Sequence, residues 1–171
     1  MTSNNLTSIL NEYNVKDIFF GSQGFHIYNI SDLDSAQLGY SKHPDGDDLT
    51  STKKGDWKKE WVVFGNDTEL GDPYFVDISD KKLPVYTAMH GVGTWEPEDV
   101  CNSLKNFLKS LQYLQSASPE SYALIEPDEK TVIDNKTLKE IKSNLINISG
   151  DKEFWNNFFT IHLEWLDENG S

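Results

Sequence analysis

The side chains best suited to metal binding or nucleophilic chemistry are four histidines and one cysteine, and they are scattered along the chain. The histidines are His26, His43, His90 and His162, and no two of them lie three or four residues apart. A helical zinc site needs two histidines on one helix face, and a thiolate cluster needs more than Cys101 alone. We therefore expect no transition-metal site, and we expect His162 to be a packed histidine.

Two stretches are rich in carboxylates that could bind a divalent cation. The acids concerned are Asp45, Asp47, Asp48, Asp67, Glu69, Asp72 and Asp77. The first stretch has the oxygen donors of a calcium loop, but it lacks the residue order and the distal glutamate of an EF-hand. The second stretch could hold an ion or simply lie on a loop. We expect neither stretch to bind a metal.

Two further motifs that carry chemistry in other proteins are incomplete here. Residues 39–43 resemble a nucleophile elbow around Ser41, but His43 stands where the second glycine is required. Gly91 and Gly93 are too few for a dinucleotide fingerprint, and no helix pattern directly follows them. We therefore expect no catalytic residue and no cofactor.

The charge of the chain is strongly acidic and unevenly distributed. There are 28 acidic residues against 15 basic ones, giving a formal charge of −13, and every basic residue is a lysine. Arginine is the usual reader of phosphate and guanine, so its absence argues against nucleic-acid binding, and the negative charge argues against an anionic membrane. The acids cluster in residues 61–100. They form either a solvated surface that keeps the protein monomeric or a face that attracts a basic partner.

The length and composition fit one domain of a soluble globular protein over residues 1–171. Apolar residues make up 37% and charged residues 25%. No window is apolar enough for a transmembrane helix, and the first five residues lack the features of a signal peptide. A lone cysteine fits a reducing compartment, so we expect a cytoplasmic protein.

Helical and strand patterns indicate which elements position these residues. Helical spacing occurs at 6–13, 32–38, 97–114, 138–148 and 153–169, and strand patterns at 25–30, 61–64, 74–78 and 85–89. Thr2 or Ser3 is expected to cap the first helix. Residues 41–59 are expected to form a surface loop. The strand at 61–64 is apolar on both faces and should be central, and the last two strands should form an antiparallel hairpin.

The helix at 97–114 has the clearest pattern. Pro97 suits a first helical position, and Glu98 and Asp99 suit the positive end of a helix dipole. Six apolar residues follow at helical spacing, namely Val100, Leu104, Phe107, Leu108, Leu111 and Leu114. Cys101 lies beside this stripe and is expected to be an inert buried thiol.

Several short segments, taken in their order along the chain, resemble a known family. They are GFHIY (24–28), LGYS (38–41), WVVFGND (61–67), GDPYFVD (71–77), LPVY (83–86) and FLKSL (107–111). This succession resembles the SUKH superfamily, in its Smi/Knr-type branch, over about residues 20–115. Residues 119–171 lie outside the resemblance, and the N-terminal helix is shorter than is usual in the family.

The resemblance implies an α+β fold with a largely antiparallel sheet flanked by helices, followed here by a helical C-terminal extension at 119–171. Bacterial members of the family are mostly immunity proteins, which bind and neutralise a cognate toxin that is often a nuclease. Fungal members are cell-wall signalling scaffolds. Neither group is known for an active site.

The residues that carry the resemblance are expected to have structural roles. They are Trp61, Gly65, Gly71, Pro73, Asp77, Pro84 and Tyr86. Gly65 and Gly71 would give the backbone freedom to an acidic turn, and Pro73 would make the start of the next strand rigid. Asp72 or Asn66 would accept hydrogen bonds from the free amides of that turn.

From charge and resemblance together we expect a non-enzymatic immunity protein whose partner is a basic domain of a cognate toxin. The expected contact residues are Asp45, Asp47, Asp48, Asp67, Glu69 and Asp72, with Tyr74 and Trp95 as exposed aromatic anchors. One alternative is a regulatory scaffold without a toxin partner. The other is a small metal-dependent hydrolase that uses the carboxylates of residues 67–77.

Overall fold

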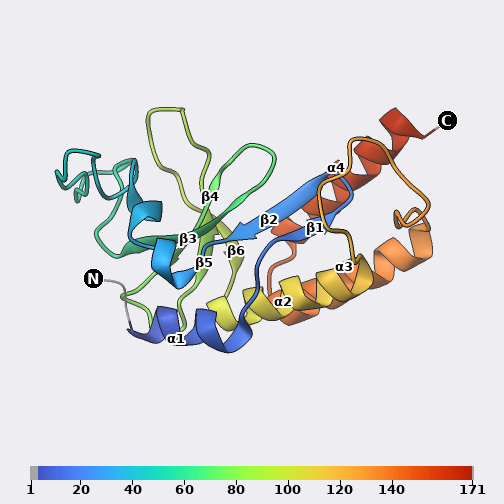
Figure 1. The fold of residues 1–171 in the computed structure, drawn as a ribbon, viewed down its shortest axis with the longest axis horizontal. Helices are drawn as coiled ribbons and strands as arrows, with labels where there is room; N and C mark the ends of the chain where they lie inside the picture. Colours follow the sequence, from blue (N-terminus) through green and yellow to red (C-terminus); the bar gives the residue numbers. More distant parts are fainter. Residues whose placement is uncertain (1–3, 171) are drawn as a thin grey trace.

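A curled antiparallel sheet of six strands forms the centre of the protein in the computed structural model, which describes residues 4–170 (Figure 1). The strands are β1 (Ile18–Phe20), β2 (Gln23–Ile27), β3 (Trp61–Asp67), β4 (Pro73–Asp77), β5 (Val85–Thr87) and β6 (Glu98–Cys101). The α-helices are α1 (Asn4–Tyr13), α2 (Leu104–Ala117), α3 (Asn135–Ser149) and α4 (Glu153–Asn169). The predicted α+β class, with an antiparallel sheet flanked by helices, is confirmed.

The strands lie in the sheet in the same order as in the sequence, so each pairs with its neighbour along the chain. Strand β3 is central and pairs with β2 on one side and β4 on the other. The predicted hairpin of the 74–78 and 85–89 strands is present as β4 and β5, with Phe75 opposite Tyr86. This simple up-and-down order needs only local connections between strands.

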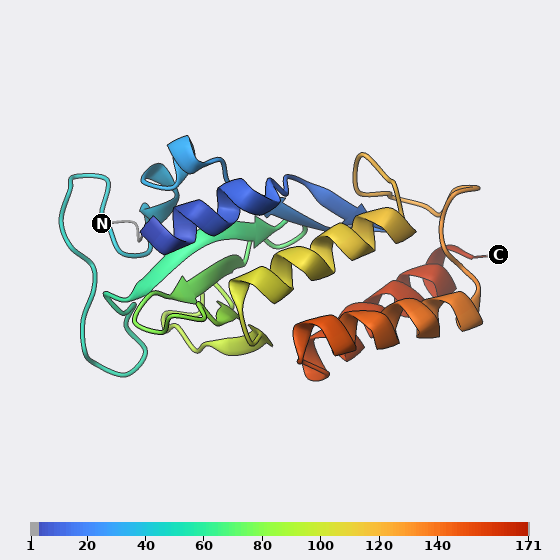
Figure 2. The ribbon, with the colours of Figure 1, turned by 90° about the horizontal axis from the view of Figure 1, so that it is seen from below.

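The helices cover one face of the sheet. Figure 2 shows α1 and α2 across this face and α3 beside α2, with α4 partly hidden behind α3. Helix α2 begins after Ser103, whose hydroxyl accepts a hydrogen bond from the backbone amide of Asn106 at 3.2 Å. Helix α3 is capped in the same way, because the Asp134 carboxylate accepts from the amide of Thr137 at 2.8 Å.

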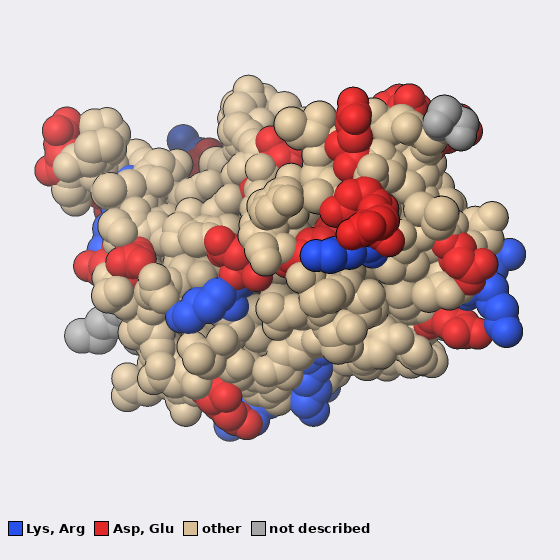
Figure 3. All heavy atoms as spheres, turned by 45° about the vertical axis from the view of Figure 1, so that its right-hand side comes forward, with Lys and Arg blue, Asp and Glu red and all other residues tan. Residues whose placement is uncertain are grey.

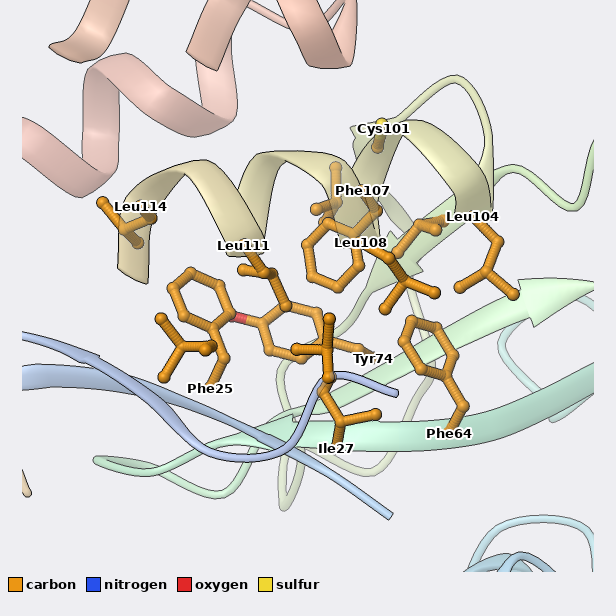
Figure 4. Packing of buried hydrophobic residues seen from close by; sticks show 14 of the residues in the cluster. Phe25, Ile27, Phe64, Tyr74, Cys101, Leu104, Phe107, Leu108, Leu111 and Leu114 are labelled. Carbon is orange, nitrogen blue, oxygen red and sulfur yellow. The ribbon is translucent and has the colours of Figure 1, made fainter. Parts of the chain in front are cut away.

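The main hydrophobic core lies between the sheet and the helices (Figure 4). The apolar stripe of α2 is fully buried in it, against rings such as Phe64 and Phe25. The C-terminal helices belong to the same core, since Leu145 of α3 and Trp155 of α4 have no exposed surface. Residues 135–169 therefore complete the burial of the sheet.

A second, aromatic cluster covers the opposite face of the sheet. Val63 and Phe75 point to this side and pack against Trp57, which comes from the predicted long loop at 41–59. The Trp57 indole donates to the carbonyl of Trp61 at 3.1 Å and so fixes the loop to β3. Strand β3 is thus covered on both faces, as its apolar pattern predicts.

The predicted helix start at Pro97 is wrong. Residues 98–101 form strand β6, in which Glu98 pairs with Thr87 and Asp99 with Tyr86, and the helix begins only at Leu104. Proline followed by two acids is typical of a helix N-terminus, but pairing with β5 decides the local structure here. Cys101 is buried as expected, and burial raises the pKa of its thiol to about 11.

The other differences concern short elements. The predicted helix at 32–38 is two 3-10 turns, Ile30–Asp32 and Ser35–Gln37, and the predicted strand at 25–30 is β2 with earlier bounds. Strand β1 was not predicted because only three residues form it, joined to β2 through a two-residue turn in which Gly21 has φ +60°. The expected caps Thr2 and Ser3 lie outside the described residues.

Truncating Leu108 should lower the free energy of unfolding by about 2–5 kcal/mol, because its side chain is 0% exposed in the core. Chemical denaturation of Leu108→Ala measures this change. Leu163→Ala on α4 is the matched control, since that side chain is 44% exposed, and its effect should stay within about 0.5 kcal/mol. Equal effects of the two substitutions would contradict the described core.

Candidate functional site

The turn between β3 and β4 is organised by one carboxylate, that of Asp67. Its Oδ1 accepts hydrogen bonds from the backbone amides of Glu69 at 2.9 Å and Leu70 at 2.6 Å, and more weakly from Gly71 at 3.4 Å. Its Oδ2 accepts from the amide of Asp72 at 2.6 Å. A carboxylate that accepts several amide hydrogen bonds holds the turn in one conformation. Asp67 is therefore committed to the hairpin itself.

Asp72 ties this turn to the loop that follows β5. Its Oδ1 accepts from the backbone amide of His90 at 2.9 Å and lies 2.7 Å from His90 Nδ1. The prediction that Asp72 or Asn66 satisfies the amides of the turn is wrong, because Asp67 does so and the Asn66 amide donates to the Asp67 carbonyl. A side-chain oxygen does accept from these amides, as predicted, but it belongs to Asp67.

The residues expected to be structural lie along the hairpins β3–β4 and β4–β5. Gly71 has φ +79°, as its turn requires. Gly65 lies in β3 at an irregular register, where an added Cβ would meet the His26 carbonyl at 2.4 Å, so close strand approach explains this glycine better than turn freedom. The Asp77 carboxylate accepts a hydrogen bond from the backbone amide of Ser79 at 2.8 Å, and this contact begins the β4–β5 turn.

The other four of these residues also have packing positions. Pro73 is the first residue of β4, and Pro84 immediately precedes β5. Trp61 and Tyr86 belong to the aromatic cluster on the sheet face opposite the helices, with ring centroids 5.1 Å and 5.8 Å from that of Phe75. A missing backbone N–H is tolerated at a strand start, which fits both prolines.

A groove of about 260 Å³ runs between the sheet and α4, next to the β3–β4 turn. Its inner walls are apolar and include Phe25 and Phe158, whose stacked rings have centroids 5.6 Å apart. Two exposed apolar side chains flank it, Leu70 at 66% and Met89 at 58% exposure. Glu69 also lines it. The groove therefore combines an aromatic interior with an acidic, solvent-exposed rim.

Tyr74 is a buried part of this groove and not an exposed anchor as predicted, since only 5% of its surface is exposed. Its ring stacks on Phe25 at 5.5 Å, and Figure 4 shows its oxygen beside that ring. Burial, with smaller contributions from Asp67 and Asp72, raises the pKa of Tyr74 well above its ordinary value. Among residues 4–170 the buried side-chain polar atoms without a hydrogen-bond partner are Glu120 Oε1 and His162 Nδ1, so the Tyr74 hydroxyl is not one of them.

The structure does not bring the remaining predicted contact residues to the groove. Trp95 is half-buried in the second cluster, with its ring 5.1 Å from that of Trp57 on the opposite face of the sheet. Asp45, Asp47 and Asp48 lie on the exposed 41–59 loop, which Figures 1 and 2 place at the end of the molecule away from the C-terminal helices. The predicted contact residues therefore lie in three places and not in one patch.

Within the groove, sequence reasoning missed the residues contributed by distant elements. Glu98 comes from β6, Met89 from the loop after β5, and Phe154 and Ile161 from α4. The sequence of α4 does indicate that this helix buries a wide surface or offers it to a partner, because its aromatic residues are too many for one narrow stripe. The helix pattern predicted for 97–114 includes Glu98, so it gives no indication that Glu98 lies in a strand beside the groove.

The carboxylates of the groove differ in whether they already have a partner. Asp67 and Asp72 are engaged as described above, whereas Glu69 and Glu98 make no ion pair among residues 4–170. In Figure 3, acidic side chains outnumber lysines over the upper half of the face shown. Free carboxylates beside an apolar groove are suited to binding a cationic group that carries an apolar stem.

The side chains of Asp67, Asp72 and Asp77 make hydrogen bonds that stabilise turns and loops. Within residues 4–170, no three His, Cys, Asp or Glu side chains are placed to hold a metal ion together. Asp67 uses both oxygens on backbone amides, and Asp77 accepts from Ser79 in the next turn. The hydrolase alternative requires these groups to act together, and their hydrogen bonds point them to different turns.

His162 is a packed histidine, as the sequence predicts. It is buried on α4, its Nε2 is 3.0 Å from the carbonyl of Val132, and its ring lies 4.7 Å from that of Phe20. Burial lowers the pKa of His162. Nearby, Glu120 Oε2 accepts from the amide of Gly21 at 2.8 Å, and burial raises the pKa of this glutamate. These contacts hold the 118–134 connector against the first hairpin and against α4.

Comparisons of the chain with known protein families, with curated proteins and with solved structures found no match. None of the helices described for residues 4–170 has the length and apolar character needed to cross a membrane.

Replacing Asp67 should destabilise the protein although its side chain is partly exposed. Asp67→Ala removes the acceptor of several amide hydrogen bonds and should cost about 1–3 kcal/mol in the free energy of unfolding. Urea denaturation measures the change. Glu69→Ala in the same turn removes a charge without removing these bonds and should stay within about 0.5 kcal/mol. A neutral Asp67→Ala would refute the structural role.

The protein should lose stability as the pH falls from 7.5 to 5.5, and His162 should be one cause. Folding lowers the pKa of His162 below its ordinary 6.5, so the unfolded chain binds the proton more strongly below that pH. His162→Gln cannot titrate, so its free energy of unfolding should fall less over this range. The raised pKa of Glu120 acts in the opposite direction and is common to both proteins. Equal pH dependence of the two proteins would show that His162 has the same pKa in the folded and the unfolded chain.

Proposed function

We propose that this protein is a non-enzymatic binding protein of immunity type, which neutralises a toxin by covering a basic surface of the toxin domain. The observation that carries the proposal is the groove beside the β3–β4 turn, where Glu69 and Glu98 remain unpaired next to apolar side chains. Interfaces join complementary charge to apolar anchors in this way.

The charge of the whole chain supports the same proposal. A formal charge of −13 without any arginine makes the protein attractive to a basic partner and repulsive to nucleic acid. A nuclease toxin must present positive charge to hold phosphates, and an acidic inhibitor can cover that surface. The inhibitor then needs no catalytic group of its own.

The resemblance of residues 20–115 to the SUKH superfamily of Smi/Knr type is the second support, because bacterial members of that family are mostly immunity proteins. The six-stranded antiparallel sheet and its flanking helices agree with the architecture that the resemblance implies. The C-terminal helices, which lie outside the resembling segment, supply one wall of the groove through α4. The proposed binding site therefore lies partly outside the resembling segment.

A regulatory scaffold is the main rival, since it would use the same acidic groove for a partner that is not a toxin. The two functions differ in what the partner does when it is unbound. An immunity protein protects cells from a toxin encoded beside its own gene, whereas a scaffold has no such effect. Co-expression with the neighbouring toxin domain therefore discriminates between them.

The decisive measurement is the association rate with a basic toxin domain, which we expect to be encoded beside the gene of this protein. We expect the rate to fall about three- to tenfold between 50 and 500 mM salt, because electrostatic steering is screened. The double variant Glu69→Gln, Glu98→Gln should associate more slowly at low salt.

The matched control is Glu129→Gln, Glu140→Gln, which removes the same number of charges from exposed positions outside the groove. This variant should keep a rate close to that of the parent protein. A toxin domain that does not bind the full chain, or a rate that does not depend on salt, would contradict the proposal.

A further inference from the structure

The 118–134 connector joins α2 to α3 and lies beside β1 and α4 (Figure 1). Its only buried residues are Ser118 and Thr131. Three of its apolar side chains are 66%, 89% and 66% exposed, namely Tyr122, Ile125 and Ile133. Apolar burial therefore contributes little to holding this segment in place, and a segment with few buried contacts opens more easily than the core does.

Polar contacts to two neighbours hold the connector instead. At the β1–β2 turn, the backbone amide of Leu124 donates to the carbonyl of Gly21 at 2.8 Å, and the Glu120 carboxylate accepts from the Gly21 amide at 2.8 Å. From α4, the Trp165 indole and the His162 ring each reach a connector carbonyl at 3.0 Å. Among these groups, His162 is the one whose ordinary pKa lies nearest to neutral pH.

The contacts of His162 determine which form of its ring fits. The carbonyl of Val132 can only accept, so the nearby Nε2 carries the hydrogen and Nδ1 of the neutral ring has a lone pair. Nδ1 has no hydrogen-bond partner among residues 4–170, and the side chain is 1% exposed. It faces Gly21, where an added Cβ would lie only 2.8 Å from Nδ1. A second N–H at this position would therefore be charged, buried and without an acceptor, which is unfavourable.

No charged side chain in residues 4–170 forms an ion pair with His162. Its neighbours from β1, from the β1–β2 turn and from the connector are Phe20, Gly21 and Val132. Glu120 reaches the same turn, but its Oε2 accepts from a backbone amide there. The acids nearby on α4, Glu164 and Asp167, are exposed. Burial lowers the pKa of His162, and the carbonyl contact opposes this shift only in part.

We propose that His162 and the 118–134 connector form an acid-sensitive latch, in which a proton on Nδ1 of His162 opens the connector away from α4. The neutral ring holds the Val132 carbonyl through Nε2 and fits against Gly21. The protonated ring needs an acceptor for a second N–H, and it reaches solvent when the connector moves. The latch does not involve the proposed toxin partner.

The direction of the pH effect follows from the pKa of His162 in the two states. The closed form lowers this pKa below its ordinary 6.5, so the open form binds the proton more strongly. The closed latch is therefore most stable above about pH 6.5 and opens more often as the pH falls below that value. Glu120 acts in the opposite direction, because burial raises its pKa in the closed form.

Amide hydrogen exchange of the full-length protein, corrected for intrinsic exchange rates, tests the latch. Protection of the Leu124 amide, which donates to Gly21, reports opening of the connector. Protection of the Leu104 amide, which donates to Leu83 at the other end of α2, reports opening of the core. We expect Leu124 to be the less protected amide at every pH. Its protection should fall about two- to eightfold from pH 7.0 to 5.5, the upper limit being set by the ordinary histidine pKa.

Three variants separate the titrating groups. His162→Gln should remove the fall in Leu124 protection. Glu120→Gln keeps an acceptor for the Gly21 amide and removes the opposing proton site, so the fall should become steeper. His43→Gln is the matched control, because that side chain is 46% exposed on the 41–59 loop, and it should leave the fall unchanged. The ring nitrogen signals of His162 in the unmodified protein give its titration directly, so the decision does not require His162→Gln to fold.

Two results would overturn the latch. One is Leu124 protection that stays constant while the ring of His162 titrates, since opening would then not depend on this proton. The other is equal protection of Leu124 and Leu104 at every pH, because the connector would then open only when the core unfolds. A fall in Leu124 protection that follows the titration of His162, at constant excess protection of Leu104, supports the latch.

Discussion

The structure depends on the need to cover strand β3 on both faces. Val62 and Phe64 point into the core beneath the helices, and Val63 points to the aromatic cluster on the other side. Because α2 can cover only one face, a long loop must return to the second face and place Trp57 there. The length of the 41–59 segment, which has no regular helix or strand, follows from this requirement.

The groove lies where the helices cover the sheet incompletely. The curled sheet is longer than α2 can cover alone, and α4 packs beside the β1–β2 end through Phe158 and Phe159 against Phe20. Between α4 and the β3–β4 turn a groove remains that no further helix closes. Asp67 fixes the turn with hydrogen bonds to backbone amides, so that neighbouring Glu69 is held at the rim without a partner of its own.

The sequence predicts the elements that depend on local periodicity. The prediction fails where pairing or packing with distant segments determines the local structure. The helix at 153–169 was predicted with both ends correct, because its apolar spacing and final glycine are local signals. Pro97 and the two acids after it resemble a helix start, yet pairing with β5 makes them a strand. Tyr74 was expected on the surface because a single strand does not reveal which face α4 covers. The groove itself joins residues from β2 to α4 and has no local signature.

The most direct test is photo-crosslinking between the full chain and the proposed partner, a basic toxin domain that we expect to be encoded beside its gene. A benzophenone amino acid at position 89 stands at the rim of the groove, and the same group at position 125 stands on an exposed part of the connector outside it. We expect a crosslink from position 89 to a toxin segment that contains lysine or arginine, and little product from position 125. Efficient crosslinking from position 125 with none from position 89 would contradict this expectation.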